Sequence, residues 1–350
     1  MSDAAPKLFL RAQALVALML CACLCAAFAT AVYLAHNTDV IAKRNESELA
    51  RQREINGVYF NAGGFKDEGD EVLIRQWPQA DYSRGGVYFI GASEMKLSLL
   101  PAMLPPGERA LIHNYALGDL RHREVYYIAR MLIEERGLLA AGPENTTVVL
   151  ALSYQSARVK NFALVGDRYV KMLFERHHLY SYNWNDGIHR AWQPPFMEQL
   201  RIERVYANRF MRSLGWERSL VRPGTMPVQV NLDHLRSFMH ADWRQVMRAE
   251  VDTLAEQIDY LQGLGVKVRA VYPPNGSWQY QLPYDAAYRA MVDPILESRH
   301  VQVYDFAHVL RDDEFGDAVH ANYGGGLKLH EAYRRVALDA LAEMGTQVRP

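Results

Sequence analysis

Cysteine is scarce in this sequence, and its three copies, Cys21, Cys23 and Cys25, all lie within one apolar run near the N-terminus. The rest of the chain therefore has no disulfide framework, no thiol nucleophile and no cysteine ligands for zinc or an iron–sulfur cluster. An excess of one charge is missing too, since the formal net charge is −1. That balance creates no basic field to attract nucleic acid, so we expect no nucleic-acid partner.

Internal repeats and low-complexity segments are also missing, and hydrophobic residues make up 49% of the chain. This composition is typical of a globular protein with a sizeable core. The adjacent pair His177-His178 is a poor chelate without carboxylates spaced around it, so the sequence predicts neither a metal nor another cofactor. The run Gly324-Gly325-Gly326 lacks the Gly-Lys-Ser/Thr ending of a phosphate-binding loop, which favours a flexible entry into a helix.

One long apolar run, from Ala12 to Ala35, contains no charged residue. A helix needs roughly 20 residues to cross the hydrocarbon core, so the run predicts a transmembrane anchor over 12–35 after a short cytoplasmic N-terminus, 1–11. Basic residues lie on both sides of it, so the positive-inside count is ambiguous and taken alone even favours the reverse orientation. Two other readings are a signal peptide cleaved near Ala29-Thr30-Ala31 and a lipoprotein signal around Cys21. All three readings place the rest of the chain outside the cytoplasm, on the periplasmic or extracellular face.

After the anchor, residues 36–80 are polar and charged, and we interpret them as a stalk leading to a catalytic domain over 81–350. Within that domain, short β-prone runs alternate with amphipathic helical patterns, which predicts an α/β fold with a mainly parallel sheet covered on both faces. The segment 157–240 shows no clean alternation, and we expect a largely helical insertion there. The expected strands are 87–90, 110–113, 147–152, 266–272 and 301–305, and the expected helices include 94–100, 121–136, 245–264 and 326–343.

Polar residues follow several of the expected strands, and in an open α/β sheet the chemistry collects at the carboxyl ends of the strands. Ser93 follows the first strand and is the candidate nucleophile. A hydroxyl needs a base, and His320, just before the last helix, can take its proton. Asp317, three residues earlier, can hold the imidazole tautomer, although it can also simply cap a turn. His308 and His330 are alternative bases.

A serine mechanism also needs hydrogen-bond donors for the oxyanion that forms on the substrate. The candidates are the backbone N–H groups of Ser93 and Gly118 and the side-chain amide of Gln155. Asn114, at the end of the second strand, is a further candidate for binding substrate, or it satisfies its own loop. An α/β-hydrolase elbow is disfavoured, because Met95 replaces the second glycine of Gly-x-Ser-x-Gly.

The order of these segments resembles the SGNH (GDSL-type) hydrolase superfamily. Gly91-Ala92-Ser93 stands where that family has Gly-Asp-Ser, 114–118 stands at its glycine-bearing second block, and Asp317-Ala318-Val319-His320 matches its terminal Asp-x-x-His. The third block departs from the family's Gly-x-Asn-Asp, because the strand here ends in Ser153-Tyr154-Gln155. The resemblance implies a flavodoxin-like three-layer sandwich and an acyl-serine intermediate on Ser93.

That departing block is similar to the DltD branch, membrane-anchored D-alanyl transfer proteins of the cell envelope, and so are Gly91-Ala92-Ser93-Glu94 and Asp317-Ala318-Val319-His320-Ala321-Asn322-Tyr323. Pro273-Pro274-Asn275 with Trp278 and Tyr280 looks similar to the same branch. The resemblance implies acyl transfer outside the membrane beside a membrane-bound O-acyltransferase (MBOAT-type) partner, from an acyl donor to an envelope polysaccharide or teichoic-acid-like acceptor. The segment 157–240 would then shape the acceptor site. D-alanyl, acetyl and other acyl groups stay open, as do transfer and hydrolysis.

A second class of function is compatible with the same residues. The domain can be a catalytically silent module that uses this fold to bind envelope polymer or a membrane acyltransferase. Intact Ser93, Asp317 and His320 favour an enzyme over such a module.

Overall fold

The computed structural model describes residues 4–36, 80–118, 120–158, 226–237 and 241–346, with short pieces between them that include 77, 181–183, 187–189 and 239. Five parallel strands form one sheet in the order β2-β1-β3-β6-β7. All residues of β1 and β3 are buried, which fits runs that are apolar on both faces. The five strands expected from the sequence are thus confirmed; they are β1 (Gly86–Ile90), β2 (Ile112–Asn114), β3 (Thr146–Ala151), β6 (Lys267–Tyr272) and β7 (Gln302–Asp305).

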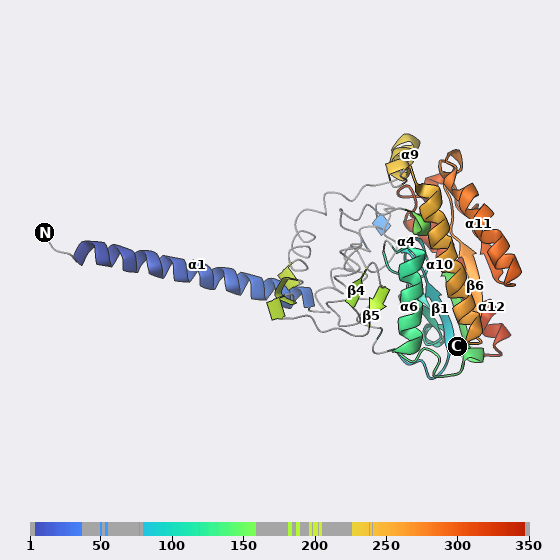
Figure 1. Ribbon diagram of the computed structural model, residues 1–350, viewed down its shortest axis with the longest axis horizontal. Helices are drawn as coiled ribbons and strands as arrows, with labels where there is room; N and C mark the ends of the chain where they lie inside the picture. Colours follow the sequence, from blue (N-terminus) through green and yellow to red (C-terminus); the bar gives the residue numbers. More distant parts are fainter. Residues whose placement is uncertain are drawn as a thin grey trace.

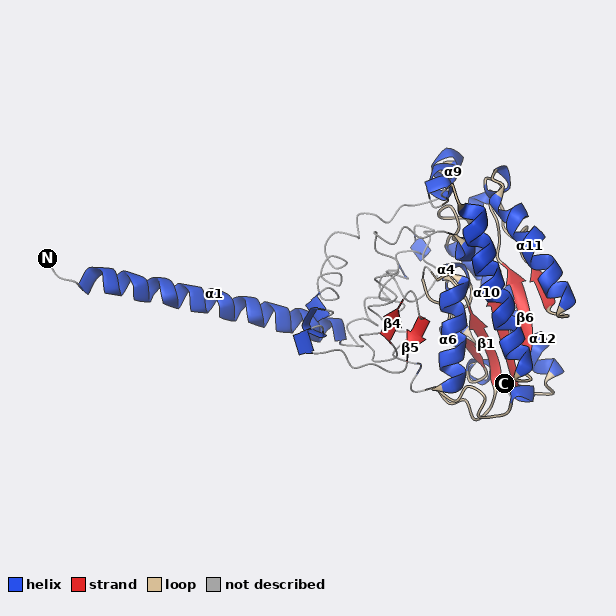
Figure 2. Ribbon diagram, viewed as in Figure 1, coloured by secondary structure: helices blue, strands red, loops and turns tan. Residues whose placement is uncertain are grey.

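Helices cover both faces of this sheet. Figure 2 shows α6, α10 and α11 in front of the strands and α12 behind them, and Tyr333 of α12 packs against Phe89 of β1. The connections from β2 to β3, β3 to β6 and β6 to β7 all run in the same direction across the sheet, and right-handed crossovers therefore place α6, α10 and α11 on one face. The helix α12 follows the last strand and covers the other face. The main helices are α4 (Ser93–Lys96), α5 (Pro106–Arg109), α6 (His122–Glu134), α10 (Trp243–Gly263), α11 (Tyr284–Ser298) and α12 (Tyr323–Glu343).

The connection that leaves β1 runs to β2, whereas the connection that leaves β3 runs the other way, to β6. This change in the direction of the connections creates a topological switch point at the carboxyl ends of β1 and β3, where α/β sheets commonly place their ligands. Several expected elements differ in extent from the sequence analysis. The last helix, α12, begins at Tyr323 rather than 326, so Gly324-Gly325-Gly326 belong to its first turn and are not a flexible entry to it. The second strand begins at Ile112 rather than 110, because Ala110 and Leu111 form the turn that ends α5, where their N–H groups donate to the carbonyls of Pro106 and Glu108. The helix expected over 94–100 is a single turn that starts at Ser93 and ends at Lys96, ahead of a second turn at Pro101–Met103.

The N-terminal apolar run is helical and forms most of α1 (Ala4–His36), which extends away from the sheet in Figure 1. Within it, Gln13–Leu34 is a span of 22 residues with mean hydropathy 2.5, and none of its apolar window is buried against the rest of the chain. By length and composition this helix can cross a membrane.

Two expected segments fall largely outside the described residues. The stalk over 36–80 is one, and the insertion over 157–240 is the other. The described parts of the insertion hold the helix α9 (Val228–Ser237) and an antiparallel strand pair, β4 (Ser181–Asn183) and β5 (Gly187–His189). The strand pair was not expected from the sequence, which predicted helix.

Candidate active site

The candidate nucleophile lies in the loop that leaves β1. Gly91 and Ala92 turn the chain, and Ser93 is the first residue of the single-turn helix α4. Gly91 must be glycine here, because a Cβ atom at this position would lie 2.6 Å from the Cβ of Ala151 at the end of β3. The close approach of these two strand ends sets Ser93 at the switch point. As the first residue of a helical turn, it has a backbone N–H with no acceptor inside that turn.

The candidate base and acid lie in a tight loop between β7 and α12. An antiparallel bridge between Phe315 and Ala321 closes this loop, and the N–H of Gly316 donates to the carbonyl of His320 at 2.9 Å. Inside it, Oδ1 of Asp317 accepts the backbone N–H groups of Val319 (2.9 Å) and His320 (2.8 Å). Asp317 therefore caps its own turn, and that turn brings its carboxylate beside the imidazole.

The three residues form a connected row. Nε2 of His320 lies 2.8 Å from Oγ of Ser93, although the two residues are 227 positions apart. On the other side of the ring, Nδ1 of His320 lies 2.8 Å from Oδ2 of Asp317. The side chains of His320 and Asp317 keep 14% and 33% of their surface exposed, so the row is reachable from outside. A general base must lie within hydrogen-bond reach of the hydroxyl that it deprotonates, and the 2.8 Å between Nε2 of His320 and Oγ of Ser93 meets that requirement.

The electrostatics of Asp317 suit an ionised partner for the imidazole. Burial works to raise its pKa, but the charge of His320 and the hydrogen bonds from the imidazole and from two backbone N–H groups outweigh burial and lower the pKa to about 2. The carboxylate is therefore ionised at neutral pH, and it can accept a proton-bearing Nδ1. In the neutral imidazole, a proton held on Nδ1 by this carboxylate leaves Nε2 as the acceptor for the hydroxyl of Ser93.

A segment after β6 braces the acid–base loop. The indole Nε1 of Trp278 donates to the carbonyl of Ala318 at 2.9 Å, and Nε2 of Gln279 donates to the same oxygen at 3.3 Å. Tyr154, in the loop after β3, donates its hydroxyl to Oε1 of Gln279 at 2.8 Å. The edge of the Trp278 ring also packs on Phe315, with ring centroids 5.3 Å apart. The loops after β3, β6 and β7 are thus linked around Ala318, which lies between Asp317 and His320.

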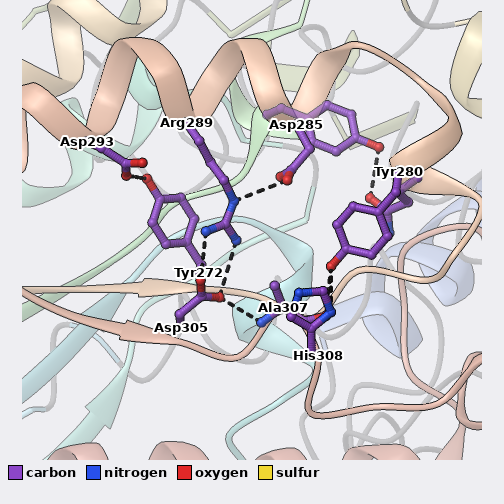
Figure 3. Close-up of polar contacts among 10 residues, drawn as sticks. Tyr272, Tyr280, Asp285, Arg289, Asp293, Asp305, Ala307 and His308 are labelled. Atoms are coloured by element: carbon purple, nitrogen blue, oxygen red, sulfur yellow. Dashed lines mark hydrogen bonds and ion pairs between the residues drawn. The ribbon is translucent and has the colours of Figure 1, made fainter.

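A charged cluster fixes the ends of β6 and β7 (Figure 3). Arg289 of α11 makes two bonds to Asp305, at 2.7 and 3.2 Å, and a third to Asp285 at 3.1 Å. Its guanidinium lies over the ring of Tyr272, 3.8 Å from the ring centroid. A two-pronged arginine–carboxylate contact is geometrically specific, so this cluster sets the direction in which both strands enter their loops.

The other two candidate bases lie elsewhere. Nδ1 of His330 accepts the backbone N–H of Leu100 at 3.2 Å, so this buried ring braces the segment after α4. His308 is exposed and stacks on Tyr280, whose hydroxyl lies 3.2 Å from Nδ1 of His308 (Figure 3). Neither histidine has a contact with Ser93 among the described hydrogen bonds.

The expected oxyanion donors lie on loops next to Ser93. The loop after β2 is bonded to the nucleophile loop, since the N–H of Leu117 donates to the carbonyl of Gly91 at 3.1 Å, and Gly118 follows directly. Gln155 lies in the short turn Tyr154–Ala157 that follows β3, and its Oε1 accepts Nη1 of Arg158 at 2.9 Å. Its amide Nε2 is buried and makes no hydrogen bond of normal geometry with the described residues, although it lies near enough to the Tyr154 hydroxyl to work toward a lower pKa of that group. A buried N–H without an acceptor is costly, which makes this amide the strongest donor candidate.

Asn114 has a different set of contacts. Its Nδ2 donates to the carbonyl groups of Met95 (3.3 Å) and Leu99 (2.8 Å), and its Oδ1 accepts the N–H of Ala116 at 3.0 Å. The side chain therefore ties the end of β2 to the segment after Ser93.

One residue beside the nucleophile was not singled out in the sequence as part of the site. Glu94 is buried; its Oε1 accepts the hydroxyl of Ser153 at 2.8 Å, and its Oε2 lies 3.4 Å from Oγ of Ser93. In the sequence it belonged to the segment Gly91-Ala92-Ser93-Glu94 that resembles the DltD branch, with no role of its own assigned. Among the residues that the structure describes, no group of three or more His, Cys, Asp or Glu side chains could hold a metal ion.

No protein-family model matches this chain, and no curated protein is significantly similar to it.

Proposed function

We propose that this protein is a membrane-anchored serine acyltransferase or esterase that works through an acyl-Ser93 intermediate. One observation carries the proposal: Ser93, His320 and Asp317 form an unbroken row of 2.8 Å contacts, with one imidazole nitrogen on the hydroxyl and the other on the carboxylate. This is the arrangement that activates a serine hydroxyl in unrelated folds.

In the first half of the reaction, Oγ of Ser93 attacks the carbonyl carbon of an ester and its proton passes to Nε2 of His320. Asp317 holds the imidazolium that forms. The carbonyl oxygen becomes an oxyanion, for which the backbone N–H groups of Ser93 and Gly118 and the buried amide of Gln155 are the candidate donors. The tetrahedral intermediate then collapses: the ester C–O bond breaks, His320 returns the proton to the leaving alkoxide, and the acyl group stays on Ser93.

In the second half, a hydroxyl of the acceptor, or water, attacks the acyl carbon. His320 takes the proton of the attacking hydroxyl and passes it to Oγ of Ser93 as the acyl–serine bond breaks. Asp317 and His320 both keep part of their surface exposed, which leaves room for an acceptor to approach the imidazole. Transfer and hydrolysis differ only in whether a sugar-type hydroxyl or water attacks.

The setting that we propose is the outer side of a membrane. The unburied apolar helix over Gln13–Leu34 supports a single-pass anchor, and the resemblance of short motifs to SGNH and DltD-type proteins supports an extracytoplasmic domain. The all-parallel sheet with helices on both faces is compatible with the SGNH architecture. We further propose an MBOAT-type membrane partner that delivers the acyl group and an envelope polysaccharide or teichoic-acid-like acceptor.

A covalent serine probe tests the catalytic proposal. A small fluorophosphonate should label the wild-type protein on Ser93 and leave Ser93→Ala unlabelled. Ser98→Ala is the matched control, because Ser98 is a buried serine five residues on whose hydroxyl bonds the backbone carbonyl of Glu94. This control should be labelled like the wild type. A correctly folded wild-type protein that the probe does not label would overturn the proposal and favour a silent binding module.

A further inference from the structure

Glu94 is a buried carboxyl group directly after the nucleophile, and the proposed mechanism gives it no chemical step. Only 7% of its surface is exposed. A carboxyl group is costly to bury unless its oxygens find donors. Its two oxygens approach serines on two different loops, Ser93 after β1 and Ser153 after β3. The side chain therefore bridges the two loops that meet at the switch point.

The two contacts of Glu94 differ in strength. The 2.8 Å bond from Ser153 has the usual length for a hydroxyl donor, whereas 3.4 Å to Ser93 is long for such a bond. Ser93 has only one hydroxyl proton and a closer acceptor, Nε2 of His320 at 2.8 Å. The firm partner of Glu94 is therefore Ser153.

Ser153 links Glu94 to Gln155, the candidate oxyanion donor. Its Oγ donates to Glu94 and at the same time accepts the backbone N–H of Gln155 at 3.1 Å. The hydroxyl of a serine can rotate, and a hydrogen bond to the Glu94 oxygen fixes the direction of its proton. The lone pairs of Oγ are then free to accept the N–H of Gln155. The backbone of Gln155 is thereby held at the start of its turn, while Arg158 holds Oε1 of the side chain and leaves the buried Nε2 to face another acceptor.

We infer that Glu94 is a positioning residue that, through Ser153, holds the Gln155 amide in place to bind the oxyanion formed at Ser93. This inference rests on the proposed function and adds a part to it. The hydrogen bond between Ser153 and Glu94 joins residues 59 positions apart and links the loops that follow β1 and β3, the two strands at the switch point. Glu94 acts here by geometry, as an acceptor for Ser153, and not as a base.

A double-mutant cycle on the labelling rate tests the inference. The measured quantity is the second-order rate constant for reaction of Ser93 with a small fluorophosphonate, which also builds negative charge on an oxygen. Gln155→Ala should slow labelling by about 10²-fold, the usual effect of losing one oxyanion donor. Glu94→Ala should slow it by about tenfold through misplacement of that donor. The double variant should be no slower than Gln155→Ala alone, since Glu94 then has nothing left to position.

Three more variants keep the test decisive if Glu94→Ala folds poorly. Glu94→Gln can still accept from Ser153, so it should label within about threefold of the wild type. Ser153→Ala should slow labelling about as much as Glu94→Ala and add nothing to Gln155→Ala. Ser98→Ala, which removes a bond to the backbone of Glu94 but not to its carboxylate, should label normally.

The outcomes separate the inference from the proposed function. Additive losses of labelling rate for Glu94→Ala and Gln155→Ala, or normal labelling of Ser153→Ala, would overturn the inference. The proposed function would still stand in that case if the wild type were labelled on Ser93. A wild-type protein that is folded but unlabelled would overturn both. Non-additive losses, with Glu94→Gln close to the wild type, would support a positioning role that needs the hydrogen bond and not the charge.

Discussion

Replacing Asp317 by asparagine separates its role in capping the turn from its role in orienting the imidazole of His320. Oδ1 accepts the backbone N–H groups of Val319 and His320, while Oδ2 accepts Nδ1 of the imidazole. An asparagine can keep its carbonyl oxygen in the Oδ1 position and so preserve the turn. Its NH₂ group then faces Nδ1 and favours the tautomer with the proton on Nε2, which cannot accept the hydroxyl of Ser93.

The expected magnitudes follow from these contacts. The loss of the charged acceptor should cost about 1 kcal/mol of unfolding free energy, and a domain of this size would then melt about 2–4 °C lower. Catalysis should fall far more, by about 10⁴-fold, as for the equivalent change in other serine triads. Asp317→Ala provides the comparison, because it also removes the acceptor of two backbone N–H groups. It should cost about 2 kcal/mol, since both groups are partly exposed and water replaces part of the bonds.

The assay is hydrolysis of a p-nitrophenyl ester together with a thermal melt for each variant. We expect similar losses of kcat/KM for Asp317→Asn and Asp317→Ala, with a fall in melting temperature about twice as large for the alanine variant as for the asparagine variant. Activity losses that follow the melting temperatures, or an asparagine variant that keeps a tenth or more of the wild-type activity, would show that Asp317 is a turn cap and nothing else.

The remaining predictions concern the frame of the site, its pH dependence and the anchor. Gly91→Ala should destabilise the domain by about 1–3 kcal/mol and abolish labelling of Ser93, because the added Cβ would lie 2.6 Å from the Cβ of Ala151; Gly263→Ala, with nothing within 4 Å, is the neutral control in the same urea unfolding experiment. Trp278→Phe keeps the packing on Phe315 but loses the bond to the acid–base loop, so ester hydrolysis should fall about tenfold with little change in melting temperature. Because the pKa of Asp317 is lowered from 3.8 to about 2 in the folded protein, its carboxylate stabilises the fold above pH 4 and loses that effect as the pH falls toward 2; the stability difference between wild type and Asp317→Asn in urea should shrink over that window. Replacing residues 12–35, rich in small side chains, with a leucine-rich span should weaken co-purification of a membrane partner and acyl transfer in cells, and unchanged values of both would reduce the anchor to a tether.

Much of the sheet was predictable from the sequence, for a physical reason. Strands covered on both faces appear as short continuous apolar runs, as in Val87-Tyr88-Phe89-Ile90 and Val148-Val149-Leu150, and turn residues separate them from amphipathic helices. The short strands β4 and β5, of three residues each, carry no such run and were missed. The beginning of the second strand was placed too early, since the pattern does not reveal that the turn ending α5 uses the preceding residues.

The contacts that hold the site together were less predictable than its three central residues. Ser93, Asp317 and His320 each stand next to a recognisable boundary of a strand or helix, so their order along the chain suggested a shared rim. The hydrogen bond between Glu94 and Ser153 forms because β1 lies beside β3 in the sheet. The hydrophobic pattern of a single strand does not reveal which strands are its neighbours. The same holds for the bond from Trp278 to the acid–base loop.

The central claim is that an acyl group resides on Ser93 during the reaction. Its most direct test is to mix the protein with p-nitrophenyl acetate, quench in acid within a few seconds and map the peptides by mass spectrometry, with Ser93→Ala treated in parallel. The account predicts one acetyl group on the Ser93 peptide of the wild type and none on the corresponding peptide of the variant, which should release nitrophenol at the background rate. Equal release of nitrophenol by both proteins, with no acetyl group on Ser93, would contradict it.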